Sequence, residues 1–365
     1  MDTVTRPTLP RTLSSAVTDP TGFLMFRADS WYTPALRASD TLGPLMAEIL
    51  KAHGSRNDIF VASLTPRDFP SVADLREFVR ALCDRTGPLG GDGIYFYDAA
   101  PAIPQAWFFN PDGSSAEFCG NGMRCLGRVI LDQRAADEAV IQSGQTQYTV
   151  SRGPATPEGV RQIRLEHPAV DFQDIEAPIR ELDPALAFTA VTVPNPHLIA
   201  LTEKFDESAL IVMGEKLAQH RGPNLSFLLP VAQDEIFVRT FERGAGLTAS
   251  CGSGMVAARA VYSRLGRAAQ DQPVIIHNAG GVAEVSLRDW RPLLLGNATY
   301  VYRADIDPAA PLPPTIDREA FDEESSSYSN LEYHNELWLD THYIEIPSRV
   351  RAGAVRAAAT EPARG

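Results

Sequence analysis

One short pattern occurs twice in the sequence, with its two cysteines 132 residues apart. Cys-Gly-x-Gly-Met occupies residues 119–123 and again residues 251–255. In each copy a polar residue, Asn110 or Glu242, stands nine positions before the cysteine, with a glycine-containing loop between them. Each copy also leads into a run with helical periodicity. A pattern repeated over this length predicts two similar halves, each of which carries a thiol at the start of a helix.

A thiol at the start of a helix has a specific chemistry. The free backbone N–H groups and the positive end of the helix dipole lie there. Both favour a thiolate, so we expect Cys119 and Cys251 to act as bases near neutral pH. The same N–H groups can hold a carboxylate, and glycine lets the backbone approach a ligand closely. The alternative is that both cysteines only pack in the interior, but the matched spacing favours a shared catalytic role.

Composition limits the classes of function. The 365 residues are 44% hydrophobic, which suits one large domain or two ordinary ones. The net charge of −13 argues against nucleic-acid binding, which needs a cationic surface. No stretch approaches the roughly 18 apolar residues of a membrane span, and the first residues lack the apolar core of a secretory signal. We therefore expect a soluble, cytoplasmic protein that acts on a small molecule, with its oligomeric state left open and a homodimer as one alternative.

We expect neither a cofactor nor a metal ion. The four cysteines are too few for a disulfide framework at this length, and they lack the spacing of zinc ligands. The three lysines, Lys51, Lys204 and Lys216, lie in no motif suited to a Schiff base with pyridoxal phosphate. Residues 90–93, Gly-Gly-Asp-Gly, are better interpreted as a turn than as a phosphate-binding loop.

Shifts in composition divide the chain into five segments. The ends are rich in Pro and Ser and show little periodicity, which is typical of extensions with little order. In the last of them we expect local structure only near residues 337–346. The expected segments are an N-terminal extension (1–45), a first half-domain with Cys119 (46–165), a second half-domain with Cys251 (166–290), a strand that returns to the first half (291–305) and an acidic C-terminal extension (306–365).

Hydrophobic periodicity predicts many strands and few helices. A helix is expected at residues 72–82, and two more follow the cysteine motifs at 124–135 and 256–265. Residues 194–197 contain two prolines and are expected to form a turn. The expected strands are 59–62, 94–97, 105–109, 140–141, 146–150, 162–165, 191–193, 236–241, 274–276, 283–285, 294–295 and 300–302.

Further motifs share the order and spacing of one known family. Residues 53–58, His-Gly-Ser-Arg-Asn-Asp, are similar to its opening His-Gly-x-x-Asn-Asp. Residues 109–125 and 242–254 look like its two cysteine motifs, and residues 195–197 match its Asn-Pro-His. Asn224 stands where that family has an asparagine that binds substrate. Over roughly residues 48–305 the chain thus resembles the diaminopimelate epimerase family.

This resemblance implies a fold and a mechanism. The fold is α/β (α+β), with two similar halves, each a barrel-like sheet wrapped around a central helix, and the active site in the cleft between them. The mechanism needs no cofactor, because one thiolate removes the α-proton of an amino acid and the other thiol returns a proton from the opposite face. The implied reaction converts LL-diaminopimelate to meso-diaminopimelate. The implied catalytic residues are Cys119 and Cys251, and the implied substrate-binding residues are Asn57, Asn110, Gly120, Asn121, Asn195, Asn224, Glu242, Arg243, Gly252 and Ser253.

Departures from the family pattern leave alternatives. Gly93 replaces the usual glutamine, Pro194 replaces a glycine, and Arg56 adds a charge beside Asn57. One alternative is therefore a racemase or epimerase of another polar amino acid on the same fold, while phenazine-type isomerases fit less well because they lack the paired thiols. Another alternative is a catalytically silent binding protein, against which the two intact cysteines count. His197, alone in its expected turn, is expected to be a structural hydrogen-bonding residue.

Overall fold

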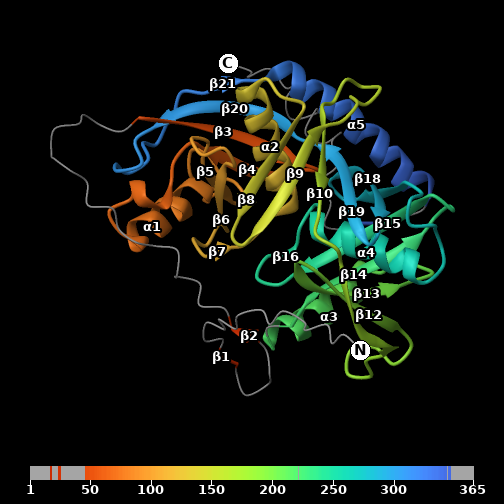
Figure 1. Ribbon diagram of the computed structural model, residues 1–365. Helices are drawn as coiled ribbons and strands as arrows, with labels where there is room; N and C mark the ends of the chain where they lie inside the picture. The colour runs from red at the N-terminus through yellow and green to blue at the C-terminus, as the bar shows by residue number, and fades with distance from the viewer. Residues whose placement is uncertain (1–16, 19–23, 26–45, 221, 343, 347–365) are drawn as a thin grey trace, which may run out of the picture.

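Two bodies rich in β-strand lie side by side, and a long helix runs along both of them (Figure 1). The predicted extension at residues 1–45 falls almost wholly outside the described residues, as does the chain after residue 346. None of the described helices is both long and apolar enough to cross a membrane. The computed structural model describes residues 17–18, 24–25, 46–220, 222–342 and 344–346.

Apart from a 3-10 helix in the first half and the first strand of the second half, the elements follow each other in the same order in the two halves. The first half contains β3 (Ala47–Gly54), β4 (Asn57–Ala62), the 3-10 helix η1 (Pro66–Asp68), α1 (Val72–Cys83), β5 (Ile94–Asp98), β6 (Gln105–Phe109), β7 (Ser115–Ala116), α2 (Gly120–Arg134), β8 (Glu138–Ser143), β9 (Thr146–Arg152) and β10 (Gln162–Glu166). The second half contains β11 (Asp171–Pro178), β12 (Ala187–Val193), β13 (Asn195–Leu201), α3 (Glu207–Gln219), β14 (Asn224–Pro230), β15 (Glu235–Glu242), β16 (Gly246–Leu247), α4 (Gly252–Arg264), β17 (Val274–Asn278), β18 (Gly281–Arg288) and β19 (Arg291–Asn297). The remaining elements are β1 (Val17–Thr18), β2 (Leu24–Met25), β20 (Thr299–Ile306), β21 (Glu319–Ala320) and α5 (Asp322–Thr341).

The strand pairing of the first half is repeated in the second. In the first half β3 and β4 form a hairpin, β4 and β5 pair in parallel through α1, and β6 and β8 pair in parallel through α2. In the second half β12 and β13 form the hairpin, while α3 joins the parallel pair β13 and β14, and α4 joins β15 and β17. The halves meet where β10 pairs with β19, and β20 then pairs with β3. This arrangement confirms the predicted α/β fold of two similar halves.

Each half wraps its strands around one buried helix. In α2 every residue from Gly120 to Leu131 is buried, and in α4 every residue from Gly252 to Tyr262 is buried. A helix that is buried on all sides needs a complete shell around it, and the surrounding strands supply that shell through two separate apolar cores. The N-termini of both helices, and the cysteines that precede them, therefore lie largely out of water.

The second half differs from the expectations at one predicted turn and at one helix that was not predicted. Residues 194–197 are not a turn, because β13 begins at Asn195 and pairs with β12 across Pro194 alone. Proline lacks an N–H group and usually interrupts strands, so the two prolines indicated a turn where β13 begins. Helix α3 was not expected. The side chain of Asp206 caps its start by accepting a hydrogen bond from the backbone nitrogen of Ala209 at 3.0 Å.

The C-terminal segment is more ordered than the expected tail with local structure near residues 337–346. It contains the 20-residue helix α5, which lies along both halves (Figure 1). Its buried residues are Tyr328, Leu331, Asn335 and Leu339, which recur at helical spacing. This buried face is hard to recognise in the sequence, because three consecutive serines precede Tyr328 and one of the four buried residues is an asparagine. Both residue types usually favour turns and caps over helix interiors.

Candidate active site

The N-termini of α2 and α4 face each other at the junction of the two halves. A Cβ atom built on Gly252 would lie 3.2 Å from the Cα of Gly120 and 3.2 Å from the backbone nitrogen of Asn121. Nearby, the side-chain amide of Asn121 donates to the carbonyl of Ser250 at 3.1 Å. Glycine permits such a close approach of two backbones. Two motifs that lie far apart in the sequence therefore form a single cluster.

Both cysteines are the N-cap residues of their helices. Their backbones are extended, and their sulfur atoms accept hydrogen bonds from the N–H groups of Gly122 and Gly254, each at 3.4 Å. The hydroxyl of Tyr95 accepts a hydrogen bond from the backbone nitrogen of Cys119 at 3.0 Å, which fixes this cap further. Each thiol of the pair Cys119 and Cys251 is thus held against the positive end of its own helix.

Burial dominates the protonation of both thiols. It raises the pKa of Cys119 to about 12, although the N–H of Gly122 and the charge of Arg124 act in the opposite direction. Burial, followed by the carboxylate of Glu242, raises the pKa of Cys251 well above its usual value. Burial therefore opposes the effect of the helix ends, on which the expectation of two bases near neutral pH rested. The loss of water outweighs the helix N–H groups.

Glu242, Ser253 and His197 surround Cys251. The hydroxyl of Thr248 donates to the carboxylate of Glu242, whose pKa is raised by burial. The hydroxyl of Ser253 lies 3.5 Å from the sulfur of Cys251 and 3.0 Å from Nε2 of His197. Burial lowers the pKa of His197 to about 3. This imidazole is therefore neutral at ordinary pH, and its contact with Ser253 suits a structural role.

Asn57 is in contact with Cys119 in the first half. Its Oδ1 atom lies 3.7 Å from the sulfur and 3.5 Å from the amide nitrogen of Asn121. Its own amide donates to Asp92 at 3.2 Å, and Arg85 pairs with Asp92 at 2.6 Å. Asp92 and Arg85 were not predicted from the sequence, because only the pairing of β4 with β5 brings them beside Asn57. The only local signal for Asp92 was its position in a glycine-rich turn.

The other predicted binding residues lie at the ends of strands. Asn195 begins β13 and Asn224 begins β14. The Oδ1 atom of Asn224 accepts a hydrogen bond from the backbone nitrogen of Arg243 at 2.8 Å, which connects it to the end of β15. Asn110 instead donates to Ser114 at 3.0 Å within its own loop. The contacts therefore join Asn57 and Asn121 directly to the cysteine cluster, whereas Asn110 is engaged locally.

Gly93 has no room for the glutamine that the family resemblance implies. A Cβ atom there would lie 2.6 Å from the ring of Phe108 and 2.7 Å from the carbonyl of Phe109, and its φ of 150° disfavours other residues. In the second half, Asn224 pairs with the third residue of β13. The equivalent position in the first half is Gly93. It lies opposite Ile59, the third residue of β4, directly before the paired residues Phe60 and Ile94. The half that carries Cys119 therefore lacks a side-chain amide that the other half has.

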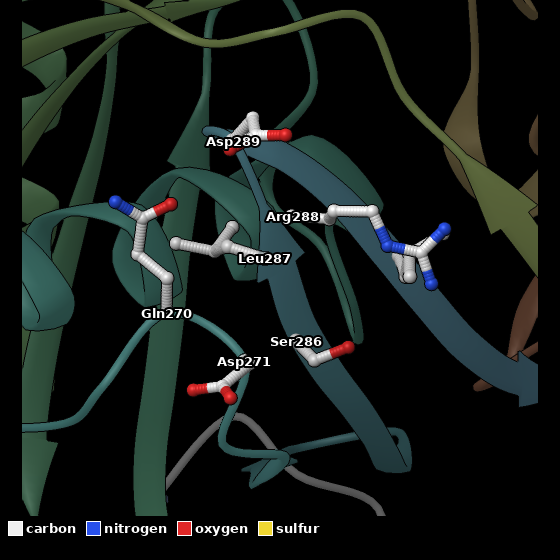
Figure 2. A pocket seen from close by; sticks show the side chains of 7 residues that line it. Gln270, Asp271, Ser286, Leu287, Arg288 and Asp289 are labelled. Atoms are coloured by element: carbon white, nitrogen blue, oxygen red, sulfur yellow. The ribbon is translucent and has the colours of Figure 1, made fainter.

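A separate hollow lies on β18 and the loops beside it (Figure 2). Its walls are formed by Gln270, Asp271, Leu293 and residues 286–289, and none of these is a cysteine or one of the predicted binding residues. This hollow is therefore separate from the cluster that the two cysteine motifs form. Among the residues that the structure describes, no group of three or more His, Cys, Asp or Glu side chains is arranged to hold a metal ion.

Comparisons with known sequences agree with this arrangement. The profile of the family described as diaminopimelate epimerase matches residues 49–152 and 189–301. The diaminopimelate epimerase of Clostridium acetobutylicum is 30% identical over 310 residues, which cover 78% of this chain and 93% of the relative. That of Listeria welshimeri is 33% identical over 281 residues, which cover 69% of this chain and 86% of the relative.

Solved structures share the fold at low sequence identity. A hydroxyproline epimerase from Agrobacterium vitis superposes with a TM-score of 0.55 at 14% identity, over 74% of this chain and 94% of that one. A phenazine biosynthesis protein of the PhzF family from Bacillus anthracis gives 0.54 at 14% identity, over 72% and 99%. These two likenesses show the fold alone. Because the family profile and the curated relatives span most of the two halves, this chain belongs to the diaminopimelate epimerase family.

Proposed function

We propose that this chain epimerises an amino acid at its α-carbon without a cofactor, with Cys119 and Cys251 as the two acid–base groups. The observation that carries the proposal is that two thiols cap two helices whose N-termini face each other. An α-carbon between the helix ends would have one thiol on each face. The reaction proposed is the conversion of LL-diaminopimelate to meso-diaminopimelate, because the curated relatives are named for that activity.

The free N–H groups at the two helix starts are suited to the α-carboxylate of the substrate. Gly120 and Asn121 supply them in α2, and Gly252 and Ser253 supply them in α4. Because the two helix dipoles converge, a carboxylate at this point gains from both. Negative charge also spreads onto the carboxylate when the α-proton leaves. Fixed N–H groups stabilise that charge without having to reorient.

The proton is carried by the two sulfur atoms in turn. One thiolate takes the α-proton from one face, and the opposite thiol donates its proton to the other face. After turnover the protonation states of the two cysteines are exchanged, so the reverse reaction uses the same groups in opposite roles. A thiol with a raised pKa gives a strong base once its proton has left, which helps with a weakly acidic α-proton. Formation of that thiolate, with release of its proton to solvent, is then coupled to binding of the charged substrate.

Charges near the two thiols are not symmetric. Arg124 in α2 is fully buried, and its terminal nitrogens make no hydrogen bond to any part of the chain that the structure describes. Burial raises both pKa values and the carboxylate of Glu242 adds to the rise at both thiols, while the charge of Arg124 opposes it at Cys119. The repeat has Val256 at the position of Arg124. We therefore expect Cys119 to lose its proton more readily than Cys251 when the substrate binds.

A substrate with charged groups at both ends fits the remaining polar residues. The carboxylate of Glu242 suits an ammonium group, and the planar guanidinium of Arg243 suits a carboxylate. The amides of Asn57, Asn195 and Asn224 add neutral donors and acceptors. An apolar side chain would pair with neither group and would displace water from the half-buried carboxylate of Glu242, which is unfavourable. Diaminopimelate carries a second amino-acid group at its far end and meets these requirements.

The direct test is exchange of the α-hydrogen in heavy water. Diaminopimelate, lysine, glutamate, histidine and leucine are incubated separately with the protein, and deuterium at the α-carbon is measured by mass spectrometry. We expect the fastest exchange on diaminopimelate. Cys119→Ala and Cys251→Ala should abolish exchange, while Cys83→Ala, a matched control at a buried thiol in α1, should retain it. Exchange at the wild-type rate by Cys251→Ala would contradict the two-base mechanism.

Gly93 favours a second candidate, an epimerase of another polar amino acid. The missing amide in the first half removes one partner that a substrate with two charged ends would use. Faster exchange on histidine or glutamate than on diaminopimelate would support this candidate. Exchange on none of the amino acids would instead favour a catalytically silent binding protein.

A further inference from the structure

Helix α5 lies outside the part of the chain that the family profile matches, which ends at residue 301. It nevertheless runs along both halves (Figure 1). In the first half, the carboxylate of Glu324 accepts two hydrogen bonds from Arg128 in α2, each at 2.6 Å, and one from the backbone nitrogen of Tyr300 in β20 at 3.0 Å. Arg128 is fully buried, so this bidentate pair is a strong anchor for the start of α5.

The far end of α5 is anchored on the second half. Asn335 lies 2.8 Å from Nδ1 of His277 and donates to the carbonyl of Asn278 at 3.1 Å. The ring of Trp338 stacks on His277 with 3.4 Å between centroids, and its indole nitrogen donates to Glu235 at 2.6 Å. The helix is thus attached to both halves by buried polar contacts.

The middle of α5 contacts the turn that precedes Asn57. The ring of Tyr328 packs edge-on against His53 at 4.3 Å, and its hydroxyl donates to the carbonyl of Gly280. Arg56 pairs with Glu332 at 2.6 Å, and the side chain of Glu332 is only 12% exposed. This turn, residues 55–56, has φ values of 51° and 62°, the left-handed region that costs non-glycine residues roughly 1 kcal/mol each. Outside contacts therefore help to keep it in this conformation.

We propose that α5 is a positioning element for the site, with Glu332 and Tyr328 holding the turn at residues 55–56 so that Asn57 stays against Cys119. Asn57 is the first residue after this turn, and its Oδ1 atom lies 3.7 Å from the Cys119 sulfur. The inference rests on the proposed function in so far as this contact serves catalysis. It also gives Arg56 a partner within the chain. Arg56, which departs from the family pattern, pairs with Glu332 of α5 and is therefore not expected to bind the substrate.

The experiment compares Glu332→Gln with His334→Gln. Both substitutions change one polar side-chain contact of the same helix, but His334 contacts Glu158 and its side chain is 59% exposed. One readout is the rate at which iodoacetamide alkylates Cys119 relative to Cys251, measured by peptide mapping. The other is kcat and KM for α-hydrogen exchange.

Glu332→Gln should raise the relative alkylation of Cys119 about tenfold, because a loosened turn further exposes this half-buried thiol and removes its hydrogen-bond acceptor. It should lower kcat about tenfold and change KM less, because Asn57, which orients the sulfur of Cys119, is displaced and not removed. His334→Gln should match the wild type in both readouts. Arg56→Met, at a half-exposed position, should reproduce the effect, and the double variant should be no worse than either single one.

Two results would overturn the proposal. One is a folded Glu332→Gln or Arg56→Met variant with wild-type alkylation of Cys119 and wild-type kcat. The other is additive losses in the double variant. If the wild type exchanges no amino acid, the proposed function fails, but the alkylation ratio still decides whether α5 positions the turn.

Discussion

Replacing Gly252 with alanine should reduce catalysis without unfolding the protein. The new methyl group would lie 3.2 Å from the backbone nitrogen of Asn121, which is close to the distance at which an acceptor oxygen would sit. The methyl group would therefore block one of the N–H donors proposed to hold the α-carboxylate. Loss of one hydrogen bond to a charged group costs about 1.5–3 kcal/mol, which corresponds to a fall in kcat/KM of about 10- to 150-fold.

The effect of Gly252→Ala on stability should be small. Gly252 does not have a left-handed φ, and alanine is favoured over glycine within a helix by about 1 kcal/mol. The contact at 3.2 Å with the Cα of Gly120 opposes this gain. We expect the free energy of unfolding in urea to stay within about 1 kcal/mol of the wild type. Activity and stability should thus be affected to very different extents.

Gly120→Ala is the matched control, because it makes the same change on the opposite helix. Its Cβ would meet the Cα of Gly252 at 3.4 Å and the ring of Phe118 at 3.5 Å, which are ordinary contacts, and no N–H donor is among its nearest neighbours. Its loss of kcat/KM should be smaller than that of Gly252→Ala. Equal losses in the two variants, or wild-type kcat/KM in Gly252→Ala, would refute the proposed carboxylate site.

Three further outcomes are expected. Alkylation of Cys119 should speed up about tenfold per pH unit from about pH 8 to about pH 11, because only the thiolate reacts and burial raises its pKa to about 12; a plateau near pH 8 would contradict this. Arg128→Met should lower the free energy of unfolding in urea by about 3–5 kcal/mol, because it leaves the carboxylate of Glu324 without its partner. Gly214→Ala should destabilise by about 1–3 kcal/mol in the same assay, because its Cβ would lie 2.2 Å from the ring of Phe241, while exchange per folded molecule stays unchanged.

The duplicated halves could be predicted because their signal is local. Cysteine, two glycines and a helical run lie within a few residues of each other, so one short window contains the whole motif. The residues that support the motif from elsewhere in the chain could not be predicted in this way. Asp92 and Arg85 support Asn57 only because β4 and β5 pair in parallel through α1, and nothing near Asn57 in the sequence indicates this.

The direction of the thiol pKa could not be predicted for a similar reason. A helix N-terminus lowers the pKa of a cysteine, and that part is visible in the sequence. Burial acts in the opposite direction, and it depends on how closely α2 and α4 approach each other. The same limit explains why α5 was not predicted as a packed helix. Asn335 is a polar residue, and its burial depends on hydrogen-bond partners on β17 that only the fold brings close.

The seam between β20 and β3 has a consequence for the order of folding. The pair Thr299 and His53 is separated by 246 residues, so the first half lacks one strand until the whole of the second half has been synthesised. During translation the edge of β3 is left without its neighbour, and unpaired edges of this kind invite association with other chains. We therefore expect slow, non-local closure to follow faster local folding around each central helix, with the final strand completing the barrel that was begun first.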